Sequence, residues 1–214
     1  MPVITSLDTQ KNNPDRVSVS LDGAFAFGAS MLLVLGRGLA IGDSLSEADI
    51  ARLEHDDSAE KAYEVALGQL SYRPRSRREV ADYLRRRKVD AEIARVVLDR
   101  LQNARLLDDV EFARYWIENR QAFQPRGSKA LRMELRQKGI SREVIEEALV
   151  DMTDEDNTAY QAGLRKMRSF GALDEREFFR KMVGFLQRRG FPYEAAAAAT
   201  RRLAEEAGRE EAEK

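Results

Sequence analysis

A six-residue stretch that occurs three times decides the fold: LRRRKV at residues 84–89, LRQKGI at 135–140 and LQRRGF at 186–191. Each copy begins 51 residues after the one before it. Its basic residues are typical of the last turn of a helix, where they face the negative end of the helix dipole. Gly139 and Gly190 suit the left-handed conformation that ends many helices. The sequence therefore predicts a helical unit repeated three times.

Around these stretches, the apolar residues recur at helical spacing. We predict a helix before each repeated one, at 62–70, 109–123 and 154–170, and another after it, so that each unit has three helices. Three pairs of a capping residue and a glutamate three positions later mark helix starts: Ser76 with Glu79, Asp108 with Glu111, and Asp174 with Glu177. Such tandem units stack on their neighbours, which favours an elongated, curved array. The expected core stripes are Val80, Tyr83 and Leu84; Ile93, Val96, Val97 and Leu101; Phe112, Tyr115 and Trp116; and Phe178, Phe179, Met182, Val183 and Leu186.

The first 60 residues follow a different pattern. Val17, Val19 and Leu21 alternate with serines before Asp22-Gly23, which suits a tight turn, and apolar alternation resumes after it. We predict a β-hairpin, a short helix at 29–35 and a further helix that Ser46 caps. The expected domains are 1–60 for this segment, 61–107, 108–152 and 153–206 for the repeats, and 207–214 for an acidic tail without fixed structure.

Composition narrows the function classes. The chain has no cysteine, which excludes disulfides, a thiolate nucleophile and cysteine-ligated metals. No apolar run approaches the roughly 20 residues that span a bilayer, so we expect a cytoplasmic protein that does not bind membranes. The net charge of −1 hides an asymmetry: residues 1–60 carry four basic and ten acidic side chains, and residues 71–105 carry eleven basic and five acidic ones.

Few side chains could support catalysis. His55, the only histidine, stands among acidic residues and is predicted to be a solvated loop residue. Gly36-Arg37-Gly38 lacks the residues that a phosphate-binding loop needs, which indicates a turn. Asp108 and Asp109 could hold a metal, but their place at a helix start favours capping, and residues 154–156 have the same explanation. We therefore predict no catalytic residue, metal or cofactor.

Aromatic side chains on the predicted helices have two interpretations. Phe112, Tyr115 and Trp116 could stack on nucleic-acid bases if they were exposed. Their spacing fits one face of one helix, which favours core packing. The same holds for the stripe that begins at Phe178.

The basic residues are the candidate binding site. A solvated helix surface usually intersperses acids among bases, whereas these clusters are rich in arginine, which makes bidentate contacts with carboxylates and phosphates. Arg132 and Arg136 lie four residues apart and can face the same ligand. The candidate partner-binding residues are Arg73, Arg75, Arg77, Arg78, Arg85, Arg86, Arg87, Lys88, Arg126, Lys129, Arg132, Arg136 and Lys138.

With these motifs in order, residues 62–206 resemble the RecX family. The resemblance rests on three groups of residues: Arg75-Ser76-Arg77-Arg78-Glu79 with Leu84; Leu106-Leu107-Asp108-Asp109 with Phe112-Ala113; and Gly127 with Leu131, Glu134-Leu135, Lys138-Gly139-Ile140, Ile145 and Ala148-Leu149. Two departures concern loops. Val89 stands where the family usually has a glycine, and Asn103-Ala104-Arg105 lacks the glycine often found before the two leucines.

The resemblance implies units similar to helix-turn-helix or winged-helix modules and a non-catalytic regulator of the RecA recombinase in DNA repair and the SOS response. Members of the family bind the RecA filament along its groove and mostly depress strand exchange, ATP hydrolysis and coprotease activity. Weak direct contact with single- or double-stranded DNA is also implied, and we expect a monomer. The alternative is a helical-repeat protein that binds DNA directly through its arginine-rich face. A hidden enzyme would require buried carboxylates to converge.

Overall fold

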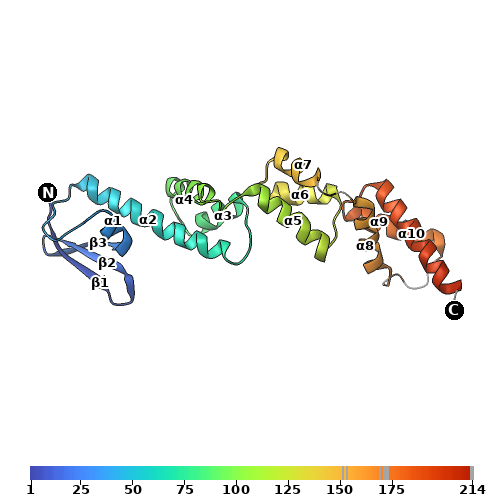
Figure 1. Cartoon of the computed structure of the whole chain (residues 1–214), viewed down its shortest axis with the longest axis horizontal. Helices are drawn as coiled ribbons and strands as arrows, with labels where there is room; N and C mark the ends of the chain where they lie inside the picture. The colour runs from blue at the N-terminus through green and yellow to red at the C-terminus, as the bar shows by residue number, and fades with distance from the viewer. Residues whose placement is uncertain (151, 153, 169, 171–173, 213–214) are drawn as a thin grey trace. The chain divides into compact units, whose positions relative to one another are not determined.

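The computed structural model describes residues 1–150, 152, 154–168, 170 and 174–212. These residues form three strands and ten helices (Figure 1). The elements in chain order are β1 (Ile4–Gln10), β2 (Asn13–Leu21), β3 (Ala24–Ser30), α1 (Met31–Gly36), α2 (Glu47–Leu70), α3 (Arg77–Arg86), α4 (Ala91–Asn103), α5 (Asp109–Phe123), α6 (Ser128–Gln137), α7 (Arg142–Val150), α8 (Glu155–Met167), α9 (Glu175–Arg188) and α10 (Tyr193–Ala212). The mainly helical fold class is confirmed.

The chain divides into two compact units. The first consists of Met1–Arg73 and Val80–Leu107, and the second of Pro74–Glu79 and Asp108–Lys214. None of the helices among the described residues is long and apolar enough to cross a membrane.

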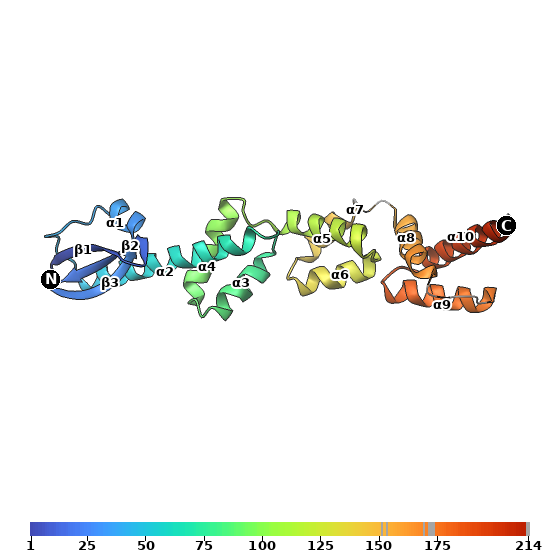
Figure 2. The ribbon, with the colours of Figure 1, turned by 90° about the horizontal axis from the view of Figure 1, so that it is seen from below.

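In the first unit, the N-terminal strands form an antiparallel sheet in the order β1-β2-β3 (Figure 2). The predicted hairpin is confirmed as β2 and β3, joined by Asp22 and Gly23 with φ angles of 50° and 85°. Val17, Val19 and Leu21 are buried on one face, as their alternation predicts. The sequence does not predict β1, because Ile4 and Leu7 are three residues apart and break the period of two.

Helix α2 begins at Ser46, which caps it as predicted. The Asp49 backbone N–H donates to Ser46 Oγ at 3.1 Å, and the Asp49 carboxylate accepts the Ser46 backbone N–H at 3.0 Å. The helix then continues through residues 54–57 and across the expected domain boundary between residues 60 and 61. The prediction of a loop at His55 was therefore wrong: His55 lies on a helix, with its side chain half exposed. The prediction failed because residues 54–57 are all polar, and the sequence does not reveal that Asp57 is buried.

The second half of α2 packs with α3 and α4 around a separate core. Ala62 and Ala66 of α2 meet Val80 and Leu84 of α3 and the apolar face of α4. The predicted stripes are confirmed apart from Val96, which is 43% exposed, and Tyr83, which is half-buried; both lie outside the core.

Besides Asp22 in the hairpin turn, two residues of the first unit hold left-handed conformations without being glycine. Lys88 has φ 60°, and Arg105 has φ 55°. Val89 donates its backbone N–H to Leu84 O at 3.1 Å, as Ile140 does to Leu135 O at the same distance. Lys88 therefore corresponds to the glycine of the later copies, and the prediction that Val89 replaces it was wrong. Val89 is instead the partly buried hydrophobe that follows the corner.

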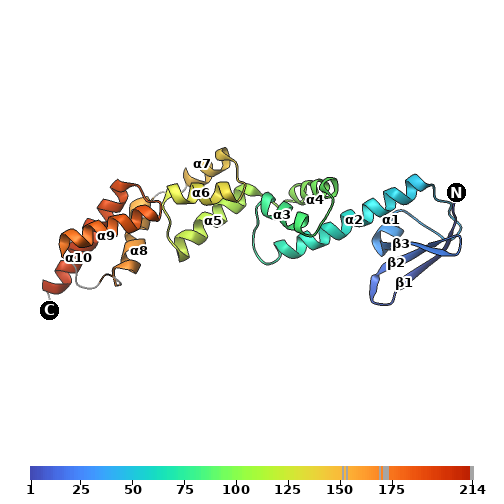
Figure 3. The same cartoon turned by 180° about the vertical axis from the view of Figure 1, so that it is seen from behind.

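The second unit contains two further cores. Helices α5, α6 and α7 surround Phe112, Leu131, Leu135 and Ile145. Helices α8, α9 and α10 surround a core that includes Met182, Leu186 and Leu203 (Figure 3). The predicted helix at 109–123 is confirmed as α5, and Asp108 and Asp174 cap α5 and α9 as predicted.

Helix α10 continues to Ala212. It includes most of the segment 207–214, for which the sequence predicted no regular structure, because alanine and glutamate are good helix formers. Residues 213 and 214 of the predicted tail lie outside the described residues.

Candidate partner-binding surface

A repeated corner contact shapes the surface of α6 in the second unit. Ser76 Oγ donates to Lys138 O at 2.7 Å, and, 51 residues later on both sides, the Gly127 backbone N–H donates to Arg189 O at 3.0 Å. The corners that follow are Gly139 and Gly190, with φ angles of 84° and 88°. These contacts place the first turn of α3 and the last turn of α9 beside α6.

Both corners need glycine for a second reason besides their backbone conformation. A Cβ atom on Gly139 would lie 2.6 Å from the side chain of Arg78, and one on Gly190 would lie 2.4 Å from Ala130. Side chains in proteins do not approach this closely, so any larger residue would push the corner off its partner.

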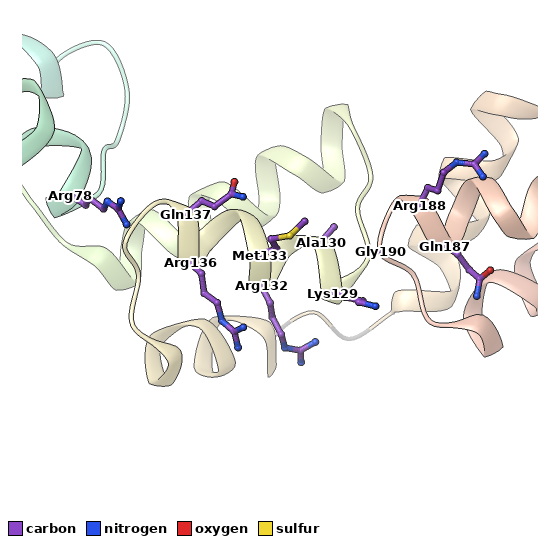
Figure 4. Close-up of a pocket in the computed structure, with 10 residues that line it drawn as sticks. All are labelled: Arg78, Lys129, Ala130, Arg132, Met133, Arg136, Gln137, Gln187, Arg188 and Gly190. Carbon is purple, nitrogen blue, oxygen red and sulfur yellow. The ribbon is translucent and has the colours of Figure 1, made fainter.

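A hollow of about 720 Å³ opens on the outer face of α6, and we call it the α6 hollow (Figure 4). Helix α6 contributes most of its lining, and the α3 and α9 ends supply the rest. None of the described residues that line it is acidic. The lining residues are Arg78, Lys129, Ala130, Arg132, Met133, Arg136, Gln137, Gln187, Arg188 and Gly190.

Arg132 anchors one side of the α6 hollow through a pair with Glu146 of α7. Arg132 Nε lies 2.9 Å from Glu146 Oε1, and Arg132 Nη2 lies 3.0 Å from Oε2. These hydrogen bonds lower the pKa of Glu146 and raise the pKa of the Arg132 guanidinium. Arg132 thus holds an internal carboxylate in the two-point geometry that guanidinium favours.

Arg136 and Lys129 leave their charges available. Their side chains make no ion pair or hydrogen bond with any residue in the described part of the chain. Figure 4 shows Arg132 and Arg136 projecting from α6 in the same direction, as their spacing predicts. Met133, next to Arg132, is 60% exposed and adds an apolar contact surface.

Two predicted site residues have internal partners instead. Lys138 pairs with Glu79, and its Nζ lies 4.8 Å above the Trp116 ring. Arg126 Nε lies 3.6 Å from Glu134 Oε1 and is buried without a hydrogen-bond partner among the described residues. Both side chains therefore face acidic residues of the second unit rather than the α6 hollow.

The remaining predicted residues lie outside the α6 hollow. Arg85 pairs with Asp82 at 2.9 Å, and the Arg87 guanidinium lies 5.4 Å from the Tyr83 ring centre. Arg86 and Lys88 are exposed at the end of α3, and Arg73, Arg75 and Arg77 are half-buried. The structure thus brings together four of the thirteen candidates: Arg78, Lys129, Arg132 and Arg136.

Sequence reasoning missed Arg188, Met133 and the two glutamines of the α6 hollow. The repeat itself carried a usable signal: Arg188 corresponds to Gln137, Gln187 to Arg136, and Lys129 to Arg78 in the 51-residue register. Extending the first cluster to the equivalent positions of the third copy would have found Arg188, which corresponds to Arg86.

The candidates for chemistry have structural roles. Asp108 accepts the Val110 and Glu111 backbone N–H groups at 2.8 and 3.2 Å. Asp109 accepts the Arg77 backbone N–H at 2.8 Å. Phe112 is buried and stacks on Trp116, with ring centres 5.9 Å apart, so the predicted core packing is confirmed for these two residues. Tyr115 is half-buried and does not belong to this core. No group of three His, Asp or Glu residues within the described ranges could hold a metal ion.

Comparison with known proteins gives matches along the chain. Four family models match in succession: the regulatory protein RecX N-terminal domain at 2–46, and the first, second and third three-helix domains of RecX at 62–101, 108–149 and 154–200. The regulatory proteins RecX of Bacillus pumilus and Bacillus subtilis are each 32% identical to the chain. The matches cover 91% and 93% of this chain and 74% and 76% of those relatives.

Solved structures agree with these matches. A crystal structure of regulatory protein RecX has a TM-score of 0.76 and 27% identity, and the match covers 91% of this chain and 97% of that one. RecX from Lactobacillus salivarius shares the fold, with a TM-score of 0.62 over 70% of this chain and 98% of that one. The three repeats, the N-terminal domain and the helical cores are therefore those of one family of regulatory proteins rather than of an enzyme. The chain belongs to the RecX family.

Proposed function

We propose that the chain binds filaments of the RecA recombinase and depresses their strand exchange, ATP hydrolysis and coprotease activity. The observation that carries this proposal is the succession of all four RecX domain models along the chain. The resemblance to that family implies RecA as the partner, and the names of the relatives give a regulatory role.

The α6 hollow is the part of the proposed contact surface with the clearest physical basis. It gathers five cationic side chains beside an exposed methionine, with no acid among its described lining residues. Arginine and methionine are both over-represented at protein interfaces.

Inhibition would follow from unequal affinity. A ligand shifts an equilibrium only by the difference in its affinity for the two states. The cationic lining of the α6 hollow suits an acidic surface on the recombinase. If successive recombinase subunits present such a surface at the right spacing only in an inactive filament, the protein would bind that state more tightly and increase its population. No catalytic step is needed.

Co-sedimentation with RecA filaments tests the proposal. We expect the chain to pellet with filaments assembled on single-stranded DNA and to stay in solution with DNA alone. Binding should weaken as salt increases, because the cations are exposed. Equal pelleting with DNA alone, together with a steep salt dependence, would instead support the rival function of direct DNA binding.

A variant pair links the binding to the α6 hollow. Arg132→Ala with Arg136→Ala should lower both co-sedimentation and inhibition of RecA ATP hydrolysis by roughly tenfold or more, since each lost contact to a charged group costs about 1.5–3 kcal/mol. Arg180→Ala with Arg201→Ala changes the net charge equally at exposed positions elsewhere and should have little effect. Lys138 is left unchanged because it stabilises the second unit.

A further inference from the structure

We propose that the α6 hollow binds an acidic peptide segment in which an apolar side chain stands between carboxylates. The inference rests on the proposed function, because it names the part of a protein partner that this surface takes. It commits to a peptide rather than to nucleic acid for the following reasons.

The charge of the α6 hollow requires an anionic ligand. Arg78, Lys129, Arg132, Arg136 and Arg188 all line it, and its described lining residues include no carboxylate. Arg132 already holds the Glu146 carboxylate through two nitrogen atoms. A carboxylate is therefore a ligand that this guanidinium accepts in its present position.

The apolar lining separates a peptide from nucleic acid. Met133 is 60% exposed, and Ala130 lies one helical turn before it. Methionine adapts its shape to apolar side chains. A nucleic-acid strand would gain affinity from aromatic platforms for its bases, and no aromatic residue is among the described residues that line the α6 hollow. Gln137 and Gln187 offer amide groups that suit a peptide backbone.

Glu146 acts in this proposal as the internal carboxylate that the ligand replaces. The Arg132 and Glu146 side chains are 36% and 45% exposed. Exposed ion pairs of this kind contribute little stability, so exchanging Glu146 for a ligand carboxylate costs little. The pair keeps Arg132 in the geometry that the ligand needs and competes with the ligand at the same time.

Fluorescence anisotropy on the full chain tests the inference. The probes are a labelled peptide with one leucine flanked by three glutamates on each side, the same peptide with serine for leucine, and a labelled oligothymidylate. We expect the leucine peptide to bind roughly fivefold or more tightly than the serine peptide, as burial of one leucine side chain allows. The Met133→Gln variant, which keeps length and helix propensity, should abolish this preference and leave oligothymidylate binding unchanged.

Two further variants complete the design. Glu146→Gln should bind the leucine peptide several-fold more tightly, and Arg132→Ala with Arg136→Ala should bind it at least tenfold more weakly. Equal binding of the two peptides, or a Glu146→Gln variant with unchanged or lower affinity, would overturn the inference. Stronger binding of oligothymidylate that depends on the same arginines would also overturn it and would assign the surface to nucleic acid. Unchanged Trp116 fluorescence confirms that each variant is folded.

The two proposals fail separately. Wild-type protein that pellets with RecA filaments but does not distinguish the peptides contradicts the inference alone. Protein that distinguishes the peptides but ignores the filaments contradicts the proposed function alone.

Discussion

Asp57 is a buried carboxylate in α2 whose charge is compensated from three sides. Arg16 Nη1 and Nη2 each lie 3.0 Å from its oxygens, the Ser30 backbone N–H donates at 2.9 Å, and Lys61 Nζ lies 2.7 Å away. Burial alone would raise the pKa of Asp57, but the hydrogen bonds from Arg16 and Lys61 outweigh it and lower the pKa. This carboxylate therefore ties α2 to the sheet.

We predict that Asp57→Asn lowers the free energy of unfolding by about 1–3 kcal/mol at pH 7, because Arg16 loses its partner. A carboxyl with a lowered pKa stabilises the fold above its unfolded pKa of about 3.9, and this contribution disappears as the pH falls through the folded pKa. Urea unfolding should show that the difference in the free energy of unfolding between wild type and variant is smaller in acid than at pH 7. A constant difference would contradict the assignment. Asp8→Asn, at an exposed position, is the matched control.

Asp109 shows the opposite behaviour. Burial raises its pKa, although the Arg77 backbone N–H and charge favour the ionised form. The amide oxygen of Asn could accept the same N–H without a buried charge. We predict that Asp109→Asn keeps or slightly increases stability at pH 7, whereas Asp109→Ala loses about 1–2 kcal/mol by leaving that N–H unpaired.

The direction in which stability changes with pH at Asp109 follows from its raised pKa. The fold disfavours the charged carboxylate, so wild-type stability should increase relative to Asp109→Asn as the pH falls through that pKa. Thermal melts of the three proteins between pH 7 and pH 4 measure this. A wild type that loses stability relative to Asp109→Asn in acid would refute the assigned direction.

At the scale of elements, the three corners after α3, α6 and α9 adopt one backbone conformation for different reasons. At Gly139 and Gly190 a neighbouring residue occupies the space that a Cβ atom would fill, and the backbone is left-handed as well. At Lys88 the left-handed backbone is the constraint. A lysine there costs strain but no clash, so the first corner tolerates a side chain that the later two exclude.

We predict opposite effects of matched substitutions at these corners. Gly139→Ala should destabilise by about 1–3 kcal/mol, because the methyl group meets both left-handed strain and the Arg78 side chain. Lys88→Gly should be neutral or stabilising by up to about 1 kcal/mol, since it relieves the strain alone. Chemical denaturation compares the two. Equal losses at both positions would show that close contact at Gly139 is unimportant.

Sequence predicted most elements, because helix caps and apolar periodicity are local signals. Ser46, Asp108 and Asp174 cap the helices assigned to them. Two failures had non-local causes. The polarity of residues 54–57 indicated a connector because nothing near Asp57 reveals Arg16, which is 41 positions away. The β1 strand is stabilised by pairing with β2 rather than by its own pattern.

At the scale of the whole molecule, the two compact units have separate cores and one useful probe. The chain contains a single tryptophan, Trp116, and it belongs to the second unit, where it donates to Glu134 at 2.8 Å. Tandem units draw their stability from their own cores and near neighbours.

We predict that Val19→Ala, in the core beside the sheet, leaves the urea midpoint of Trp116 fluorescence nearly unchanged. The same substitution should make part of the circular dichroism signal change at lower urea concentrations than in the wild type. Leu135→Ala should lower the fluorescence midpoint by an amount equivalent to about 2–5 kcal/mol. If Val19→Ala shifts both signals equally, the chain unfolds as one cooperative unit and the prediction is wrong.

The candidate surface was less predictable than the fold. Spacing along one helix correctly predicts that Arg132 and Arg136 lie together. It does not show that Lys138, close to them in sequence, contacts Glu79 and Trp116 instead of the α6 hollow. Arg78 and Arg188 reach the α6 hollow only through tertiary corner contacts. Arginine content therefore indicates where binding residues are abundant, and the packing decides which of them share a surface.

The continuity of α2 sets a constraint on chain length. Leu53 near its start is buried against the sheet, and Ala62 and Ala66 near its end are buried against α3 and α4. One residue inserted between Leu53 and Ala62 would turn the later pair by about 100° around the helix axis. The number of residues between Leu53 and Ala62 is thus fixed by the directions in which these side chains must point. Another N-terminal domain could replace this one only if it joined α2 with the same rotation about the helix axis.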